Sequence, residues 1–341
     1  EPWAVRFDAN GHIPSLRSQD NEPLEFIRPG ALANVFQLFD DNPLFWSAWD
    51  VDAFAFETGR DLLRADSVEI VERGPVRIAY ETVRSFGNSR IRQRISLGPT
   101  PGVRFDTEID WHEENKMLKV AFPLNVHTDH AKCEIQFGHV SRPTHRNTSW
   151  DEAKFEVCAQ KWVDLSEAGQ GVALINTGKY GHDVLGDTVR LSLLRAPKAP
   201  DPECDMGRHR FTYVLLPHYE GLTQSPVVAS SYAVNAPVHV VPLAARRGTR
   251  TRTGRLITVD DPNLVIESVK RSEDGKALIV RLYECHGARG RAFLSLGQPI
   301  RHACLANMEE VPGEALPCDE ETVTLDYRPF GILTVRLETA G

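Results

Sequence analysis

The chain has 341 residues, of which 41% are hydrophobic and 25% are charged, and its formal net charge is −8. These values are ordinary for a folded protein, and the length allows two domains with a substantial buried core. The acidic balance argues against a nucleic-acid partner and against an anionic membrane, because both favour a concentrated basic face. The sequence contains no run of the roughly 18 apolar residues that a membrane helix needs.

The first residues and the cysteines indicate the cellular context. The sequence begins without a methionine or a signal-peptide pattern and becomes strand-like at once, so we expect a piece of a longer protein. The cysteines show no C-x-x-C spacing, which argues against a zinc–cysteine site. We therefore expect reduced thiols and a cytoplasmic protein. The cysteines are Cys133, Cys158, Cys204, Cys285, Cys304 and Cys318.

The dominant period along the chain is two, because apolar or β-branched residues alternate with polar ones. Such alternation predicts antiparallel strands with one solvated face. In chain order, the strand-like segments are 76–82, 90–97, 104–111, 119–126, 133–137, 154–165, 189–194, 211–216, 256–259, 277–284, 292–296, 322–327 and 332–338. Only 31–40 and 306–310 suggest a helical turn. We expect sheets to bury Ile78, Tyr80, Ile95, Phe105, Ile109 and Val157.

The composition changes near residues 242–254, which suggests a domain boundary. Pro242 precedes an arginine-, threonine- and glycine-rich run at 246–252, which we expect to be an exposed linker. Strand-like sequence resumes at 256. Prolines and glycines punctuate short strands throughout, so the predicted fold class is all-β. We expect a large antiparallel domain over residues 1–245 and a small β-sandwich over 246–341.

The segment His127-Thr128-Asp129-His130 contains the H-x-D and H-x-x-H spellings of several metal sites. Its neighbours on both sides read as strands, and residues three apart on a strand point to opposite faces. The two histidines therefore cannot share a metal ion without a turn. A solvated hairpin tip is the better interpretation.

Asp110, Glu113 and Glu114 form the densest group of carboxylates after a strand. Glycosidases need two carboxyl groups that face each other about 5 to 9 Å apart. Adjacent residues on an extended chain diverge instead. We therefore expect a solvated turn here and no catalytic pair.

Arg195 closes one strand-like segment and precedes the acidic loop 201–209, which contains Asp205 and His209. A guanidinium in this position can bind a carboxylate or a pair of sugar hydroxyls, and it can equally form a structural ion pair. The residues alone favour neither interpretation.

Residues 142–151 are polar, include Arg142, His145 and Trp150, and lead into the predicted strand 154–165. Aromatic rings can stack on sugars, and tryptophans are more often core residues. The other tryptophans considered for sugar stacking are Trp46, Trp49 and Trp162. Tryptophan alone is weak evidence for sugar binding.

Taken together, a series of segments in order resembles the C-terminal β region of family 38 glycoside hydrolases, the retaining α-mannosidases. The resemblance covers nearly the whole chain and is closest from 110 to 218. The segments that carry it are 39–43, 49–52, 110–113, 118–123, 137–145, 147–151, 155–156, 162–167, 191–197, 205–209 and 217–218.

The resemblance implies a large β-supersandwich of the galactose mutarotase-like type, followed by a small β-sandwich, packed against a catalytic domain. It also implies that the nucleophilic aspartate and the ligands of zinc or another divalent metal lie in an N-terminal catalytic part. We therefore expect no catalytic residue and no metal site in this chain, which alone should be inactive. The residues expected to bind substrate or to face the catalytic domain are Arg195, Asp205, His209, Arg142, His145 and Trp150.

The resemblance implies two partners: the catalytic domain of the same protein and a mannose-containing oligosaccharide. A homo-oligomer is also compatible with the sequence. The alternative hypothesis is a stand-alone carbohydrate-binding β module. A third hypothesis, an aldose epimerase, would need a histidine and a carboxylate that converge in a cleft, and no spacing here favours one.

Overall fold

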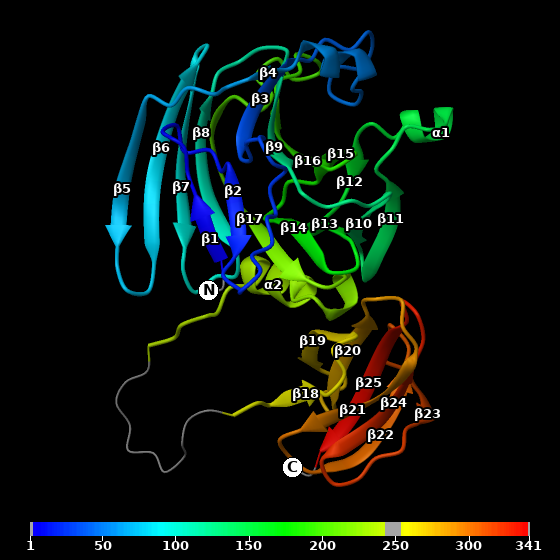
Figure 1. Ribbon diagram of the computed structural model, residues 1–341. Coiled ribbons are helices and arrows are strands. Elements are labelled where there is room, and N and C mark those ends of the chain that lie inside the picture. Colours follow the sequence, from blue (N-terminus) through cyan, green and yellow to red (C-terminus); the bar gives the residue numbers. More distant parts are fainter. Residues whose placement is uncertain (1–2, 243–253, 340–341) are drawn as a thin grey trace. The chain divides into compact units, whose positions relative to one another are not determined.

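The structure is a computed structural model that describes residues 3–242 and 254–339 (Figure 1). It divides into two compact units. Unit 1 comprises Glu1–Glu134 and Val140–Val238, and unit 2 comprises Ile135–His139 and His239–Gly341. The basic run 246–252 and the expected boundary at 245 lie outside the described residues, so that boundary stays a prediction. None of the described helices is long and apolar enough to cross a membrane.

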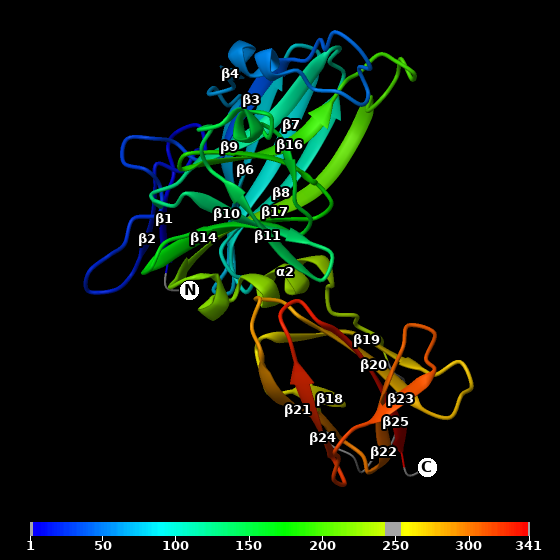
Figure 2. The same ribbon diagram turned by 90° about the vertical axis from the view of Figure 1, so that its right-hand side faces the viewer.

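Unit 1 contains a nine-stranded sheet in the order β11-β10-β13-β14-β17-β8-β7-β6-β5. Its strands, in chain order, are β5 (Ser67–Arg73), β6 (Ile78–Phe86), β7 (Ser89–Leu97), β8 (Val103–Trp111), β10 (His130–Ile135), β11 (Gly138–Pro143), β13 (Trp162–Ser166), β14 (Gln170–Asn176) and β17 (Gly207–Tyr219). Strands β7, β8 and β17 pair antiparallel and lie side by side in one curved sheet (Figure 2).

A six-stranded sheet in the order β12-β15-β16-β9-β3-β4 forms the second layer, and β1 (Trp3–Arg6) pairs with β2 (Ser15–Ser18). The strands of the second layer are β3 (Val35–Asp40), β4 (Arg60–Asp61), β9 (Lys116–Pro123), β12 (Val157–Cys158), β15 (Gly181–Leu185) and β16 (Thr188–Arg195). One apolar core lies between the two large sheets. At its centre Phe105 of β8 stacks on Tyr213 of β17, and both rings contact Phe122 of β9.

The strand predictions hold where alternation is strict. Along β8 every second residue is buried, as expected for a strand with one solvated face. Ile95, Phe105 and Ile109 are buried, as predicted, whereas Tyr80 and Val157 are only half-buried. The prediction for Ile78 is wrong, because this residue is 58% exposed. It is the first residue of β6, which lies next to the edge strand β5.

Three local predictions are corrected. Residues 31–40 do not form a helical turn, because Val35–Asp40 is β3, whose apolar residues are buried. Residues 306–310 are not helical either, since Ala306 ends a strand and a turn follows. The segment 154–165 is two short strands in different sheets. The chain crosses from β12 to β13 at Ala159, which is fully buried, so the apolar alternation spans a change of sheet.

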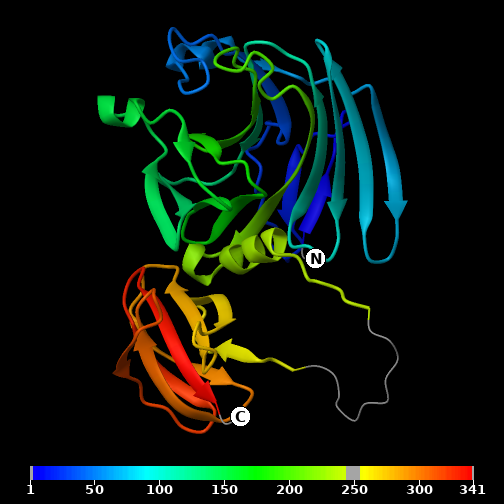
Figure 3. The ribbon, with the colours of Figure 1, turned by 180° about the vertical axis from the view of Figure 1, so that it is seen from behind.

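The helices of unit 1 are short: α1 (Ser149–Glu152), α2 (Val227–Asn235), and the 3-10 turns η1 (Ala53–Thr58) and η2 (Leu222–Gln224). Helix α2 packs against β13 and β14 (Figure 3). The sequence analysis did not predict it, because valine, serine and tyrosine are mediocre helix formers. Packing against the sheet therefore stabilises this helix more than intrinsic propensity does.

Unit 2 is a small sandwich of a five-stranded sheet, β19-β20-β25-β22-β23, and a three-stranded sheet, β18-β21-β24, around its own core. Its strands are β18 (Ile257–Val259), β19 (Leu264–Arg271), β20 (Leu278–Glu284), β21 (Gly290–Leu296), β22 (Ile300–Ala306), β23 (Pro312–Ala315), β24 (Thr322–Tyr327) and β25 (Ile332–Thr339). The turn 135–139 belongs to this unit, since Phe137 packs on Tyr283 and His139 packs on Phe330.

Candidate functional site at the loop end of unit 1

Arg195, the last residue of β16, forms a two-point ion pair with Asp41. The guanidinium Nε lies 2.6 Å from Asp41 Oδ2, and Nη2 lies 3.0 Å from Oδ1. The same Nη2 donates to the carbonyl oxygens of Ser47, at 3.1 Å, and Asp50, at 2.6 Å. The side chain of Asp41 is 1% exposed and that of Arg195 is 21% exposed. Of the two readings left open by the sequence, the geometry therefore supports the structural ion pair.

The acids of the loop 201–209 are not the partners of Arg195. His209 lies on β17 rather than in the loop, and its Nε2 is 2.7 Å from the carbonyl oxygen of Asp205 in the preceding loop. Asp205 itself has a left-handed backbone with φ 59°. Arg195 therefore binds Asp41 and the backbone of the segment 44–50, whose tryptophans the sequence analysis considered for sugar stacking.

The other expected site residues lie in a different place. Thr144 accepts a hydrogen bond from the backbone of Gly186 in the turn between β15 and β16, at the opposite end of β16 from Arg195. His145 lines a hollow of about 820 Å³ there, together with 126–129 and 185–188. Arg142 donates to the carbonyl oxygen of Cys158 at 3.3 Å, and Trp150 on α1 is 80% exposed. The six predicted residues therefore do not form one site.

The segment 127–130 is exposed, as predicted, but it is not a hairpin tip. It connects β9 of the six-stranded sheet to β10 of the nine-stranded sheet. His130 Nδ1 lies 3.0 Å from Asp129 Oδ1, and the His130 ring meets His145 edge-on at 6.4 Å. Within 3–242 and 254–339, no group of three histidine, cysteine or acidic residues is arranged to hold a metal ion.

The three carboxylates on or just after β8 each have their own partner: Asp110 lies on the strand, and Glu113 and Glu114 follow it. Asp110 pairs with His112 at 3.0 Å, and Glu114 pairs with Lys198 at 2.9 Å. Glu113 is buried rather than solvated, which corrects the predicted turn. Its Oε1 accepts from the backbone N–H of Asn88 and from the Ser89 hydroxyl. The three carboxylates are therefore engaged by three different sets of partners.

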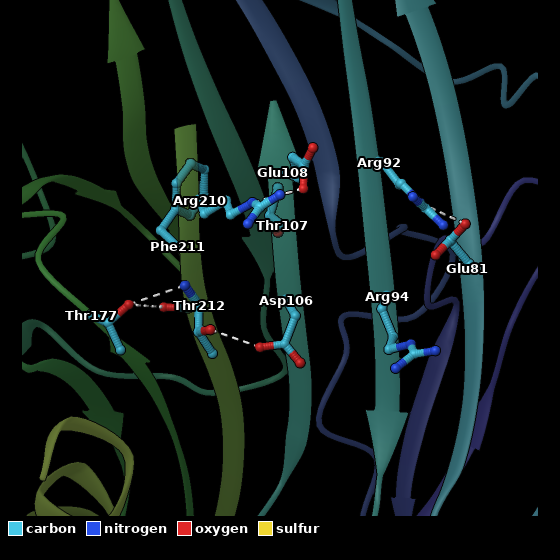
Figure 4. A pocket seen from close by; sticks show the side chains of 10 residues that line it. All are labelled: Glu81, Arg92, Arg94, Asp106, Thr107, Glu108, Thr177, Arg210, Phe211 and Thr212. Atoms are coloured by element: carbon cyan, nitrogen blue, oxygen red, sulfur yellow. Dashed lines mark hydrogen bonds and ion pairs between the residues drawn. The ribbon is translucent and has the colours of Figure 1, made fainter. Parts of the chain in front are cut away.

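Cross-strand charge pairs on β6, β7, β8 and β17 of the nine-stranded sheet line a hollow of about 480 Å³ (Figure 4). Arg92 pairs with Glu81 at 2.8 Å, and Arg210 pairs with Glu108 at 2.8 Å. Arg94 lies between Glu81 and Asp106 in the strand ladders and also lines this hollow. Exposed pairs of this kind contribute little individually, so we interpret this face as a solvated sheet surface.

A buried ion cluster near η1 was not predicted. The fully buried ammonium of Lys119 lies 2.7 Å from Asp183, contacts Glu156 and lies 4.5 Å from the centre of the Phe56 ring. Beside it, burial lowers the pKa of His182 to about 4. A lysine inside the apolar run 117–124 was the only sequence signal for this cluster.

Comparison with known proteins places this architecture in a family. The profile described as "Glycosyl hydrolases family 38 C-terminal domain" matches residues 3–203, which is more than half of the chain. The profile described as "Glycosyl hydrolases family 38 C-terminal beta sandwich domain" matches residues 263–335. The chain belongs to glycosyl hydrolase family 38, as its C-terminal region. The predicted family and all-β fold are thereby confirmed.

The relatives of this family 38 chain are longer than it is. It is 41% identical over 341 residues to Alpha-mannosidase 2C1 of Homo sapiens, and the alignment covers 98% of this chain and 32% of the relative. It is 33% identical to Alpha-mannosidase of Saccharomyces cerevisiae, and this alignment covers 89% of this chain and 31% of the relative. The chain thus spans about a third of the length of these relatives.

A solved structure confirms the fold. A glycosyl hydrolase family 38 protein from Enterococcus faecalis superposes with a TM-score of 0.80 at 19% identity. The match covers 99% of this chain and 43% of that one.

Proposed function

We propose that this chain is the non-catalytic β region of a retaining α-mannosidase that hydrolyses terminal α-mannosides. In this proposal it supports and completes the active site of a catalytic part of the same protein. The observation that carries the proposal is the family match over both units, with relatives that are named α-mannosidases and are about three times as long.

The arrangement of carboxylates supports the non-catalytic role. Retaining hydrolysis needs a nucleophilic carboxylate and an acid/base about 5 Å apart across the scissile bond. Asp110, Glu113 and Glu114 are each engaged by a different partner. The nucleophile is therefore assigned to the catalytic part.

A divalent metal such as zinc is also assigned to the catalytic part, where it would bind sugar hydroxyls. This assignment is supported by the geometry of the metal-like segment, in which His130 pairs with Asp129. In this chain the role left to Arg195, Asp205 and His209 is to face the catalytic part.

We further propose a cytoplasmic location for the protein. All six cysteines lie within the described residues and all are free thiols. Free thiols are typical of a reducing compartment.

Hydrolysis of an aryl α-mannoside tests the proposed function. The complete gene product should cleave it, whereas chain 1–341, with zinc or cobalt added, should match the blank without protein. Turnover by chain 1–341 that survives repurification and disappears in the Glu113→Gln or Asp129→Asn variant would overturn the proposal. Failure of the complete gene product to cleave any α-mannoside would also contradict it.

A further inference from the structure

A hollow of about 820 Å³, here called the three-loop hollow, is lined by three loops of unit 1. The loops are 126–129 between β9 and β10, 144–146 after β11, and 185–188 between β15 and β16. Arg28 and Arg190 complete the lining. Small-molecule sites typically have volumes of about 300 to 1,000 Å³, so the three-loop hollow has the size of a binding site.

Hydrogen bonds tie the three loops together. The N–H of Thr144 donates to the carbonyl oxygen of Asp129 at 3.0 Å, and the N–H of Gly186 donates to the carbonyl oxygen of Thr144 at 2.6 Å. The hydroxyl of Thr144, which is a buried residue, donates to the carbonyl oxygen of Thr128 at 2.7 Å. The walls of the hollow are therefore held in place before a ligand binds, which reduces the entropic cost of binding.

Two of the three arginines that line the hollow have carboxylate partners. Arg28 Nη1 lies 2.6 Å from Asp187 Oδ1, and Arg190 Nη1 lies 2.7 Å from Asp183 Oδ1. A site for phosphate or another strong anion concentrates cationic groups without such partners. The three-loop hollow therefore suits a neutral ligand.

The other polar groups of the hollow combine donors with acceptors. Arg146 and His127 are exposed and supply N–H groups, and the carboxylate of Asp129, which is 80% exposed, supplies acceptor oxygens. Every hydroxyl of a sugar both donates and accepts, so guanidinium, imidazole and carboxylate groups around one hollow match the hydroxyls of a sugar ring. Leu185, which is 41% exposed, adds an apolar surface for the C–H groups of the ring.

Helix α1 contacts the hollow and carries an exposed aromatic ring. Asp151 Oδ2 lies 3.8 Å from Nδ1 of His145, which lines the hollow. The neighbouring residue on the helix, Trp150, is 80% exposed. The apolar face of a tryptophan ring is a surface on which the C–H groups of a sugar can stack. The hollow and this helix together offer both kinds of contact that an oligosaccharide needs.

We propose that the three-loop hollow binds a neutral oligosaccharide. Arg146, His127 and Asp129 hold hydroxyl groups of one sugar, and Trp150 stacks on a further ring. The choice of a mannose-containing ligand rests on the proposed function, whereas the polar and aromatic contacts rest on the lining of the hollow.

Histidine modification in the complete gene product tests this site without requiring turnover. Diethyl pyrocarbonate acylates exposed imidazoles, and mass spectrometry measures the rate at His127 and at His302, an exposed reference on unit 2. The probe ligand is an S-linked α-mannobiose, in which sulfur replaces the scissile oxygen so that it is not hydrolysed. At about five times its Kd, this ligand should slow the labelling of His127 by about sixfold and leave that of His302 unchanged.

A variant tests which groups hold the ligand. Arg146→Ser removes charge-assisted hydrogen bonds to sugar hydroxyls and should raise the Kd, measured from the protection of His127, by at least about tenfold. The matched control Arg301→Ser removes an exposed arginine of unit 2 and should leave the Kd unchanged. A Kd that is the same in Arg146→Ser and in the parent would contradict the inference.

The remaining outcomes separate this site from the proposed function. Protection of His127 in a protein that cleaves no α-mannoside would overturn the proposed function and leave the oligosaccharide site standing. Hydrolysis of α-mannosides without protection of His127, or equal protection by the acyclic polyol mannitol, would overturn the inference. An unreactive His127 in the ligand-free complete protein would also overturn it, because another part of the chain would then cover the hollow.

Discussion

At the scale of single residues, the ion pair of Arg195 with Asp41 fixes the segment 44–50 at the end of β16. A buried carboxylate that loses its partner costs several kcal/mol, so this pair is a strong constraint on the segment 44–50, whose carbonyl oxygens at Ser47 and Asp50 also bind Arg195. The sequence placed Arg195 at a strand end, where functional side chains are common. It could not identify Asp41 as the partner, because 154 residues separate them and the contact depends on the sheet pairing of β16, β9 and β3.

A double-mutant cycle tests the positioning role of Arg195. In the complete protein, Arg195→Ala and Asp41→Asn should each lower kcat/KM by about tenfold, and the double variant should lose little more than either, because both remove one support of one loop. Steady-state kinetics measure this. A loss for Arg195→Ala that far exceeds that of Asp41→Asn, with effects that multiply, would mean that Arg195 contacts the substrate.

The buried position of His182 leads us to expect that unit 1 becomes less stable as the pH falls. Its side chain is fully buried near Lys119 and Asp183, and burial lowers its pKa from 6.5 to about 4. The unfolded chain therefore binds a proton that the folded chain rejects, and stability falls as pH falls from 6.5 to 4. The slope is about 1.4 kcal/mol per pH unit, which gives a loss of about 3 kcal/mol across this window.

Urea unfolding of chain 1–341 at pH 7 and pH 4.5 measures that loss. In His182→Asn the fall in unfolding free energy should be smaller by about 2 kcal/mol than in the parent. His127→Gln, at an exposed position of the same unit, serves as the control. An identical pH dependence in His182→Asn and the parent would show that His182 does not cause it.

At the scale of secondary-structure elements, sequence pattern succeeded where one sheet face is solvated. The arginines of β7 alternate with Ile91 and Ile95, and the structure places them on opposite faces. Pattern failed where a segment is buried on both faces or changes sheet. Residues 35–40 look helical because apolar residues occupy both faces of β3, and 154–165 looks like one strand because the alternation continues through Ala159.

The turn after β20 is organised by a single buried carboxylate. Glu284 is fully buried, and its two oxygens accept from the backbone N–H groups of His286, Gly287, Ala288 and Phe330 at 2.8 to 2.9 Å. An amide in its place offers one acceptor oxygen and leaves buried N–H groups unpaired. The glutamate therefore fixes two loops of unit 2.

We expect Glu284→Gln to destabilise unit 2 by about 2 kcal/mol. The buried thiols of Cys285 and Cys304 report on this unit, and their reaction with a thiol reagent should accelerate by about thirtyfold. The exposed Glu314→Gln is the matched control. Unchanged labelling of both cysteines in Glu284→Gln would contradict the account of this turn.

At the scale of the whole molecule, each of the two units has its own apolar core. The family and the all-β fold could be read from the sequence, because local motifs carry both. The exposure of each tryptophan could not, since an exposed tryptophan and a core tryptophan read alike until the sheets are assembled: Trp49 is 73% exposed, and Trp162 is buried.

Reconstitution tests the central claim most directly. The catalytic part of the complete gene product and chain 1–341 are purified separately, and aryl α-mannoside hydrolysis is measured for each alone and for mixtures. We predict that neither piece alone exceeds the blank by much and that activity rises on mixing and saturates at equimolar chains. A catalytic part that is fully active alone, or hydrolysis by chain 1–341 alone, would contradict the account.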